Sequence, residues 1–342
     1  MSERSLIAEW EPQQAVMIAW PHAGTDWASM LGRVQECYRR IASAIAEDEP
    51  LIIVTPEPDV VRQQLAHIDN SRLTIVQCDT DDTWTRDYGP LATLTTDGIK
   101  LLDFTFNAWG MKFAASHDNL VTNNLAKQGI FPYSIENHRD MVLEGGSIEC
   151  DGNGTIMTTA ECLLSPNRNA AWNKIRIEQE LCHRLGARQI LWLEHGFVPG
   201  DDTDSHIDTI ARFAPGGVIL HTTAHESSKE YAEMQLMIKQ LASFTDADGN
   251  PYRLVALPAP PVLTDEDGQR MPATYANFLI TNHSVLVPTY GNPETDAEAL
   301  RIIQGVFTDR KAIGIDCLPL IEQHGSLHCA TMQIPRQLHN IK

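Results

Sequence analysis

The chain has 342 residues, 43% of them hydrophobic, which is enough for a substantial core in one large domain or two ordinary ones. Asp and Glu outnumber Lys and Arg by 45 to 26, and the formal net charge of -19 argues against nucleic acid or an anionic membrane as a partner. Neither an apolar run of about 18 residues nor a basic leader followed by an apolar stretch is present, so we expect no membrane-spanning helix, no secretion signal and a cytoplasmic location.

Short strands rich in Val, Ile, Thr and aromatic residues alternate with amphipathic helices along the whole chain. The predicted strands cover residues 15–20, 51–55, 73–78, 99–106, 155–159, 189–193, 217–222, 252–257, 278–281, 284–290, 311–316 and 330–335. The predicted helices cover residues 26–46, 58–67, 116–128, 167–186, 226–243 and 295–307. Asp26 is a suitable N-cap for the first of these helices.

Hairpin-type turns recur along the chain, at residues 96–98, 151–154, 215–217 and 282–283. They are spaced by roughly 55 to 65 residues, and each precedes a strand, a helix and another strand, which indicates a diverged internal repeat. The N-terminal strand, helix and strand form a further copy that the last strand completes. About five ββαβ units result, and their closure around an axis would leave few bare sheet edges. By pattern alone a doubly wound sheet is equally open, although paired hairpins count against it.

The segment WTRDYGP, residues 84–90, places Asp87 at the end of an element, where functional residues concentrate. Arg86 beside it could pair with Asp87 and make both residues structural. Trp84 is an aromatic residue in an otherwise polar run, which suits the wall of a site for a cationic or apolar ligand.

Glu144 follows the apolar residues 141–143 and precedes two glycines, so it is expected at a strand end with the backbone close behind it. A carboxyl group between apolar residues tends to have a raised pKa and can carry a proton. A solvent-exposed turn glutamate is the alternative.

Residues 200–209, GDDTDSHIDT, hold the densest group of ionisable side chains: Asp201, Asp202, Asp204, His206 and Asp208. On a strand, His206 and Asp208 would face the same side, where a carboxylate could stabilise the protonated imidazole. A divalent metal is the alternative use of these acids. It is disfavoured because no calcium-loop or HExxH spacing is present and no second histidine stands nearby.

Cys329, within HGSLHCATMQIP (residues 324–335), lies just before a strand-like run and is the best candidate among seven cysteines for a reactive thiol. The cysteines are odd in number and form no CxxC pair, so neither a disulfide framework nor a zinc finger is expected. A thiolate needs a cationic neighbour, which protonated His206 or a cationic substrate could supply. His328 is the poorer candidate, because on an extended strand it would point to the other face. Taken alone, a Cys before a strand is usually a core residue.

Together these motifs resemble the agmatine deiminase and bacterial peptidylarginine deiminase family of guanidino-group-modifying enzymes. The resemblance covers nearly the whole chain through residues 84–90, 106–113, 144–147, 201–213, 289–300 and 325–333. It implies a pentein fold, a five-bladed ββαβ propeller with pseudo-fivefold symmetry, formed here by residues 1–342 as one catalytic domain. The catalytic residues that it implies are Cys329, His206, Glu144, Asp87 and Asp208. The substrate-binding residues that it implies are Asp87, Asp208, Trp84 and Trp109.

The activity implied is hydrolysis of a C–N bond in a linear amidine, without metal or organic cofactor. Asp87 and Asp208 would grip the planar guanidinium through paired hydrogen bonds, and Cys329 would attack its carbon. The favoured substrate is agmatine, giving N-carbamoylputrescine and ammonia on a route to putrescine. The alternative is deimination of peptidyl or free arginine. An amidinotransferase and a non-catalytic polyamine-binding protein rank lower.

The sequence departs from the common family pattern near the site. Family members typically carry Trp-Gly-Gly where this chain has Trp109, Gly110 and Met111, a Gly where Ser205 stands, and Gly-Gly-Gly-Asn where residues 324–328 read HGSLH. These positions bear on the pocket for the substrate tail. The expected partner is a small cationic guanidino compound, and a homo-oligomer is compatible with the fold.

Overall fold

The computed structural model describes residues 4–337. Within this range the strands form five separate sheets of three or four strands each. In every sheet an antiparallel pair of strands is followed by a helix and by a third strand that lies parallel to the second. The chain is therefore a mixed α/β protein built from repeated ββαβ units.

Four units are continuous in the chain, and a predicted hairpin turn joins the first two strands of each. The first unit comprises β5 Leu91–Thr95, β6 Gly98–Thr105, α5 Val121–Lys127 and β7 Ser134–Val142. The second comprises β8 Ile148–Cys150, β9 Thr155–Thr159, α7 Lys174–Leu185 and β10 Gln189–Leu193. The third comprises β11 Ala211–Ala214, β12 Val218–His221, α9 Tyr231–Leu241 and β13 Arg253–Ala256. The fourth comprises β14 Leu279–Ile280, β15 Ser284–Thr289, α10 Pro293–Val306 and β16 Lys311–Asp316.

The fifth unit combines the two ends of the chain. It comprises β17 Met332–Pro335, β2 Gln13–Ala19, α1 Leu31–Asp48 and β3 Leu51–Thr55. Two outer strands extend the sheets, since β1 Arg4–Leu6 pairs with β5 and β4 Leu73–Gln77 pairs with β3. The remaining longer helix is α2 Pro58–Gln64. The predicted completion of the N-terminal unit by the last strand is confirmed by the antiparallel pairing of β17 with β2.

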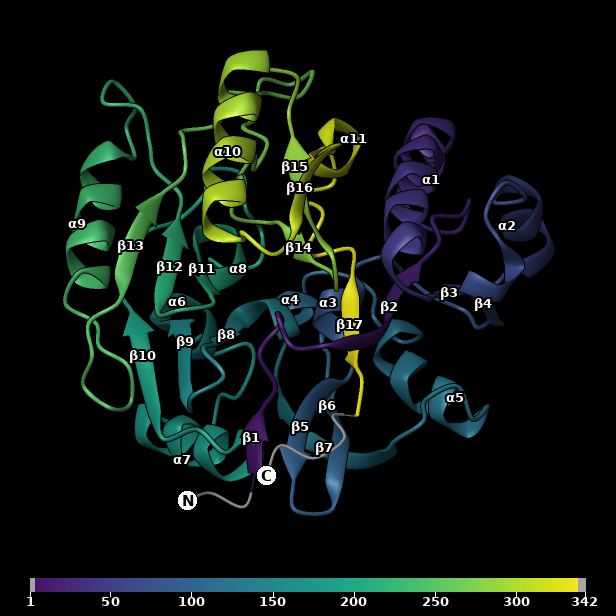
Figure 1. The fold of residues 1–342 in the computed structure, drawn as a ribbon, viewed down its shortest axis with the longest axis horizontal. Coiled ribbons are helices and arrows are strands. Elements are labelled where there is room, and N and C mark those ends of the chain that lie inside the picture. The colour runs from purple at the N-terminus through teal and green to yellow at the C-terminus, as the bar shows by residue number, and fades with distance from the viewer. Residues whose placement is uncertain (1–3, 338–342) are drawn as a thin grey trace.

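The helices cover the sheets through one apolar face each. In α1 the buried side chains include Val34, Tyr38, Ile41 and Ile45, at the spacing of an amphipathic helix. Pro50 follows directly and cannot continue the helix. Figure 1 shows α1, α7, α9 and α10 toward the outside of the molecule and the short helices α3 and α8 nearer its middle.

The predicted helix over residues 167–186 begins seven residues too early. Helix α7 starts after Asn173, whose side chain caps it by accepting a hydrogen bond from the amide of Arg176. It ends as predicted at Gly186, which has φ 73 and lies so close to Arg4 that a Cβ atom would stand 1.9 Å from the Arg4 carbonyl oxygen. Residues 167–173 instead form a loop that carries Arg168.

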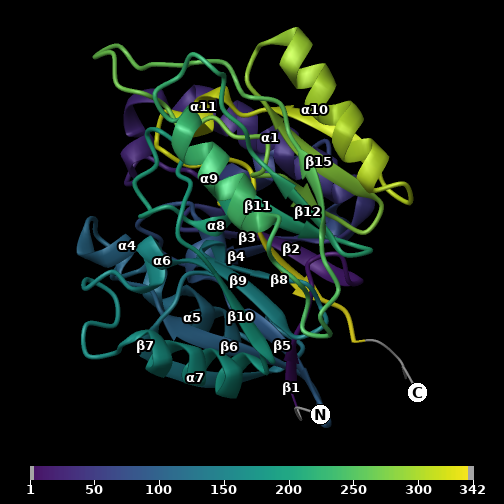
Figure 2. The ribbon, with the colours of Figure 1, turned by 90° about the vertical axis from the view of Figure 1, so that its left-hand side faces the viewer.

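The other helical segments are short. They are the α-helices α3 Thr85–Tyr88, α4 Ala108–Met111, α6 Ala160–Leu163, α8 Ile207–Ile210 and α11 Leu318–Ile321, and the 3₁₀ turns η1 Asp26–Met30, η2 Asn70–Arg72, η3 Asp118–Leu120 and η4 Gly145–Ser147. Figure 2 shows α4 and α6 on the left of the molecule and α10 at its upper right. No helix within residues 4–337 has both the length and the apolar character needed to cross a bilayer.

Candidate active site

A short turn precedes the first strand of every unit, and the candidate site residues come from these five turns. The turns are α3, η4, α8, residues 275–276 and residues 327–330. The polar side chains in these turns or directly next to them, in chain order, are Asp87, Glu144, His206, Asp208, Asn277 and Cys329. The repeated topology therefore brings together residues as far apart in the sequence as Asp87 and Cys329, which are separated by 242 positions.

Hydrogen bonds hold neighbouring turns against one another. The amide of Arg86 donates to the carbonyl of Cys329 at 3.1 Å, and the amide of Gly146 donates to the Asp87 carboxylate at 2.9 Å. A Cβ atom on Gly146 would stand 2.7 Å from Nδ1 of His206 and 2.8 Å from the Asp87 carboxylate. Only glycine leaves room for these two side chains, which explains the second glycine of the EGGS motif.

Cys329 lies in the turn that precedes β17, three residues before that strand begins. Its Sγ accepts a hydrogen bond from the Asn277 amide at 3.3 Å and lies 3.7 Å from Oδ2 of Asp208. Burial, together with the charges of Asp208 and Asp87, raises the pKa of the Cys329 thiol well above its ordinary value. The Cys329 thiol therefore keeps its proton at neutral pH.

The two carboxylates expected to grip a guanidinium have different environments. Burial and the charge of Asp208 raise the pKa of Asp87, against the hydrogen bond that the Trp109 indole donates to Asp87 at 2.9 Å. Burial alone would raise the pKa of Asp208 too, but the hydrogen bond and charge of His328 hold it below its ordinary value. Oδ1 of Asp208 is buried without a hydrogen-bond partner, which leaves an acceptor for a ligand.

His206 does not lie on a strand, as the sequence suggested, but caps the short helix α8, with Asp208 in its first turn. Its Nδ1 lies 3.6 Å from the Asp87 carboxylate, and neither ring nitrogen has a hydrogen-bond partner. Burial lowers the pKa of His206 to about 3. Of the two cations considered for stabilising the thiolate, protonated His206 and a cationic substrate, this lowered pKa disfavours the first in the resting state. The ring is neutral and free to accept a proton.

Glu144 lies two residues beyond β7 and is fully buried rather than in a solvent-exposed turn. Nε of Arg168 donates to both carboxylate oxygens of Glu144, at 2.9 and 3.0 Å. Burial raises the pKa of Glu144 although the charge of Arg168 opposes that rise. Arg168 also binds Asp204 at 2.6 Å, and Asp204 binds Lys112 at 2.6 Å. The sequence reasoning missed Arg168, which has no distinguishing pattern around it.

His328 does not lie on the extended strand that the sequence suggested, although its side chain does lie outside the substrate pocket. Residues 327–330 form a turn rather than an extended strand, and His328 is fully buried. Its Nδ1 lies 2.7 Å from Oδ2 of Asp208. Asn277 was missed as well, although it stands before the hairpin at residues 282–283 as Asp208 stands before the hairpin at 215–217.

A pocket of about 180 Å³ opens over Cys329 and Asp87. Aromatic walls come from Trp84, Trp109 and Phe113, and a Cβ atom on Gly325 would stand 2.3 Å from the Trp84 ring. The other residues that line it are Asp26, Asp82, Asp202, Thr203, Gln323 and His324. The lining is therefore aromatic and acidic, and none of the described residues in it is Lys or Arg.

Two buried groups in residues 4–337 could bring three ligand atoms to one point: Glu144 with Cys162 and His206, and Glu9 with Glu149 and His328. An arginine already occupies each group. Arg168 binds Glu144, and Arg212 binds both Glu9 and Glu149. Three of the four acids in residues 201–208, which were considered as metal ligands, have partners within the protein. Asp201 accepts from Thr203 and Ser205, Asp204 binds Lys112 and Arg168, and Asp208 contacts His328.

Comparisons with known proteins identify the family of this chain. Residues 5–335 match the model of the Porphyromonas-type peptidyl-arginine deiminases. A Shewanella baltica protein provisionally named agmatine deiminase is 36% identical over 96% of this chain and 93% of its own. The crystal structure of a Porphyromonas gingivalis protein provisionally named arginine deiminase has a TM-score of 0.93 at 46% identity, over 98% of this chain and 100% of its own. An agmatine deiminase of C. jejuni with substrate bound has a TM-score of 0.91 at 34% identity, over 98% of this chain and 97% of its own. The chain belongs to the Porphyromonas-type peptidyl-arginine deiminase family.

Proposed function

We propose that this protein is an agmatine deiminase, a hydrolase that converts agmatine to N-carbamoylputrescine and ammonia. The observation that carries the proposal is a buried thiol, Cys329, which lies near the carboxylates of Asp208 and Asp87 and lines an acidic pocket. The agmatine deiminase named above, 34% identical to this chain, supports the same activity.

The chemistry follows from the charges of the site. A guanidinium between Asp87 and Asp208 brings a positive charge next to the Cys329 thiol, which lowers the cost of forming the thiolate. The thiolate attacks the guanidinium carbon. The thiol proton passes through neutral His206 to the departing amino group, so the C–N bond breaks with release of ammonia and an amidino group stays on the sulfur.

In the second half of the reaction His206 accepts a proton from water as the oxygen attacks the amidino carbon. The C–S bond breaks, the thiol regains a proton, and the ureido product leaves. One proton is released in this half and is taken up by the ammonia. Glu144, held by Arg168, lies beside this path as a second proton carrier.

The lining of the pocket favours agmatine over arginine. Asp26, Asp82 and Asp202 face the region that the substrate tail would occupy. Burial raises the pKa of Asp82 to about 7, and a primary ammonium nearby would favour its ionised form. An ammonium tail is therefore attracted, whereas the carboxylate of free arginine would be repelled. Trp84 and Trp109 supply flat apolar walls for the methylene chain.

The same proposal includes the finer points of architecture and location. We infer that the five sheets form a five-bladed propeller with pseudo-fivefold symmetry, and that the whole chain is a single catalytic domain. The shared ββαβ topology and the meeting of five turns at the site support this arrangement. A cytoplasmic location and a metal-free, cofactor-free reaction also belong to the proposal.

The test is release of ammonia and of a ureido product from agmatine, free arginine and a peptide with a C-terminal arginine. A Cys329→Ala variant is assayed in parallel. We expect turnover of agmatine only, lost in the variant. Turnover of the peptide or of free arginine would instead favour the deiminase activity in the family's name. Absence of turnover with all three would contradict the proposal.

A further inference from the structure

A chain of buried contacts leads from Asp208 away from the substrate pocket. Oδ2 of Asp208 lies 2.7 Å from Nδ1 of His328 and 3.7 Å from the Cys329 sulfur. The other ring nitrogen of His328 lies 2.8 and 3.0 Å from the two carboxylate oxygens of Glu9. His328 therefore spans two carboxylates, one in the candidate active site and one outside it.

Glu9 is itself fixed from three sides. Arg86 contacts its Oε1 at 3.1 Å, Arg212 contacts its Oε2 at 2.6 Å, and the Gln333 amide donates to Oε2 at 3.1 Å. Arg212 also lies 3.1 Å from Nε2 of His328 and donates to the carbonyl oxygen just before β14 at 2.8 Å. Burial alone would raise the pKa of Glu9, but the charges of Arg86, His328 and Arg212 hold it well below its ordinary value. Glu9 is thus an ionised carboxylate that balances the two arginines.

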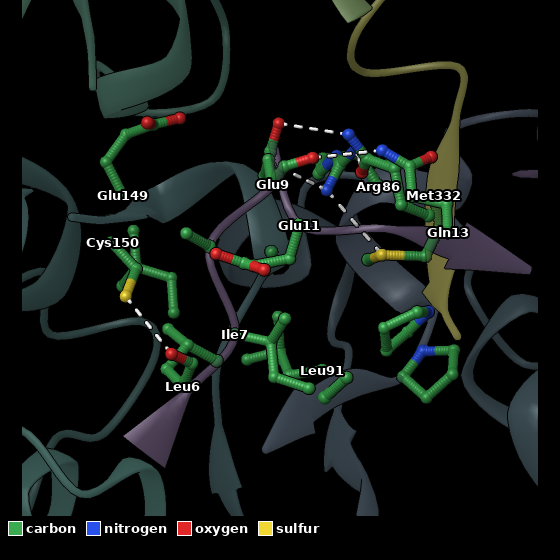
Figure 3. Close-up of a pocket in the computed structure, with 17 residues that line it drawn as sticks. Leu6, Ile7, Glu9, Glu11, Gln13, Arg86, Leu91, Glu149, Cys150 and Met332 are labelled. Atoms are coloured by element: carbon green, nitrogen blue, oxygen red, sulfur yellow. Dashed lines mark hydrogen bonds and ion pairs between the residues drawn. The ribbon is translucent and has the colours of Figure 1, made fainter. Parts of the chain in front are cut away.

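A second pocket, of about 60 Å³, lies on the far side of these contacts. Glu9, Glu11, Arg86 and Met332 line it, and Figure 3 shows Glu9 beside Arg86 at its upper edge. Arg86 lines this pocket, whereas the next residue, Asp87, lines the substrate pocket. The side chain of Glu9 is 22% exposed there, while that of His328 is fully buried. Glu9 therefore touches neither the substrate pocket nor the thiol.

We propose that Glu9 is a positioning residue for the reaction, which acts through His328 to hold Asp208 against the substrate guanidinium and Cys329. The Asp208 oxygen can only accept, so His328 must donate from Nδ1. The ionised Glu9 can likewise only accept, so Nε2 donates to Glu9, and this contact fixes the rotation of the ring. Oδ2 of Asp208 is then fixed by His328, and the free Oδ1 is kept for the substrate. This inference rests on the proposed function.

The experiment compares Glu9→Gln, which removes the charge, with Glu9→Asp, which keeps it, and with Glu11→Gln on the wall of the same pocket. We expect Glu9→Gln to lower kcat/KM for agmatine by about tenfold or more, mostly in kcat, as for other residues that orient a catalytic group. Glu9→Asp should recover part of this loss. Glu11→Gln should match the wild type.

A second readout does not depend on turnover. Alkylation of Cys329 by iodoacetamide is followed against pH. The charged groups that face the thiol and His328 are Asp208, Asp87, Glu9, Arg86 and Arg212. Removal of the negative charge of Glu9 makes a thiolate less costly, so the midpoint should move to lower pH in Glu9→Gln and not in Glu11→Gln.

A double-mutant cycle tests the route through His328. His328→Asn keeps an amide donor near Asp208 but is too short to reach Glu9. In this background Glu9→Gln should change kcat/KM by less than about twofold, because the contact it removes is already lost. An equal loss in both backgrounds, or no difference between Glu9→Gln and Glu11→Gln in both readouts, would overturn the proposal. If the wild type fails to convert agmatine, the proposed function fails. The alkylation measurement then still tests the role of Glu9, because it does not depend on turnover.

Discussion

At the scale of single residues, the site combines a thiol that resists ionisation with carboxylates placed to receive a cation. Burial and the charges of Asp208 and Asp87 raise the pKa of Cys329. A substrate guanidinium offsets those charges when it binds. Activation of the nucleophile is therefore tied to binding of a cationic substrate, which protects an acidic enzyme from unwanted thiol chemistry.

Cys329→Ser should abolish turnover and keep binding. A serine hydroxyl is a much poorer nucleophile at neutral pH, so kcat should fall by at least about a thousandfold. The carboxylates of Asp87 and Asp208 remain, so calorimetry should detect agmatine binding with an affinity close to the wild-type KM. Turnover by this variant near the wild-type rate would exclude the proposed nucleophile.

Arg168→Ala should destabilise the protein as well as the site. Both Arg168 and Glu144 have fully buried side chains, and loss of the arginine leaves the Glu144 carboxylate uncompensated. Such changes cost about 3–5 kcal/mol of unfolding free energy. Urea unfolding at a pH of about 7.5 measures this loss of unfolding free energy. The control is Arg62→Ala, since Arg62 pairs with Asp59 at the surface and its loss should cost less than about 0.5 kcal/mol. Equal midpoints for the two variants would contradict the role of the buried pair.

At the scale of elements, α4 combines function with strain. Ala108, Trp109 and Met111 have φ of 53, 53 and 67, and Gly110 between them has φ 89. A left-handed backbone is unfavourable for residues that carry a Cβ atom. The segment is held because the Trp109 indole donates to Asp87 and the Asn107 side chain accepts from the amide of Gly110.

Met111→Gly should therefore stabilise the protein. Met111 is 72% exposed, so little packing is lost, and relief of the left-handed conformation contributes about 1 kcal/mol. Thermal unfolding measures the change, and kcat for agmatine should stay within about twofold because Trp109 keeps its bond to Asp87. The control is Leu236→Gly in the middle of α9, where glycine should cost about 1 kcal/mol. A loss of stability in both variants would show that the backbone at Met111 is not strained.

Much of the element pattern could be predicted because apolar periodicity and turn residues are local signals. The four hairpin turns and helix α1 are examples. The strands β1, β5, β7, β8 and β11 were not predicted. Strand β7 is polar with only one buried residue, and the other four have between three and five residues. Asn277 and Arg168 were missed because their roles depend on partners elsewhere in the chain. Nothing local marks Asn277 as the donor to a thiol 52 positions away.

At the scale of the whole molecule, side-chain hydrogen bonds join the fifth unit, which contains both ends of the chain, to the fourth unit. Asn282, in the hairpin of β14 and β15, accepts a hydrogen bond from the Gln13 amide at 2.9 Å and donates to the Gln13 carbonyl at 3.0 Å. The Asn282 side chain also donates to Glu49, which follows α1. Beside this contact, the hydroxyl of Thr281 donates to Asp48 at 2.6 Å. These bonds join segments more than 200 residues apart in the sequence.

Glu49 makes this junction sensitive to pH. The side chain is buried, and one of its oxygens has no hydrogen-bond partner. Burial and the charge of Asp48 raise the pKa of Glu49 from 4.5 to about 8. A carboxyl group whose pKa is raised by folding keeps its proton in the folded state while the unfolded chain releases it. The stability of the protein therefore falls as the pH rises from 4.5 to about 8.

Glu49→Gln should remove this part of the pH dependence. Glutamine keeps an acceptor for Asn282 and cannot ionise, so the variant should match the wild type near the lower end of the window. Above its upper end the variant should be more stable by about 1–3 kcal/mol, the cost of a poorly satisfied buried polar group. Urea unfolding across the window measures the difference, with Glu47→Gln on the exposed side of α1 as the control. Other buried acids are common to all three proteins and cancel in the comparison. If the stability difference between Glu49→Gln and the wild type were the same at both ends of the window, Glu49 would not be the group that titrates at this junction.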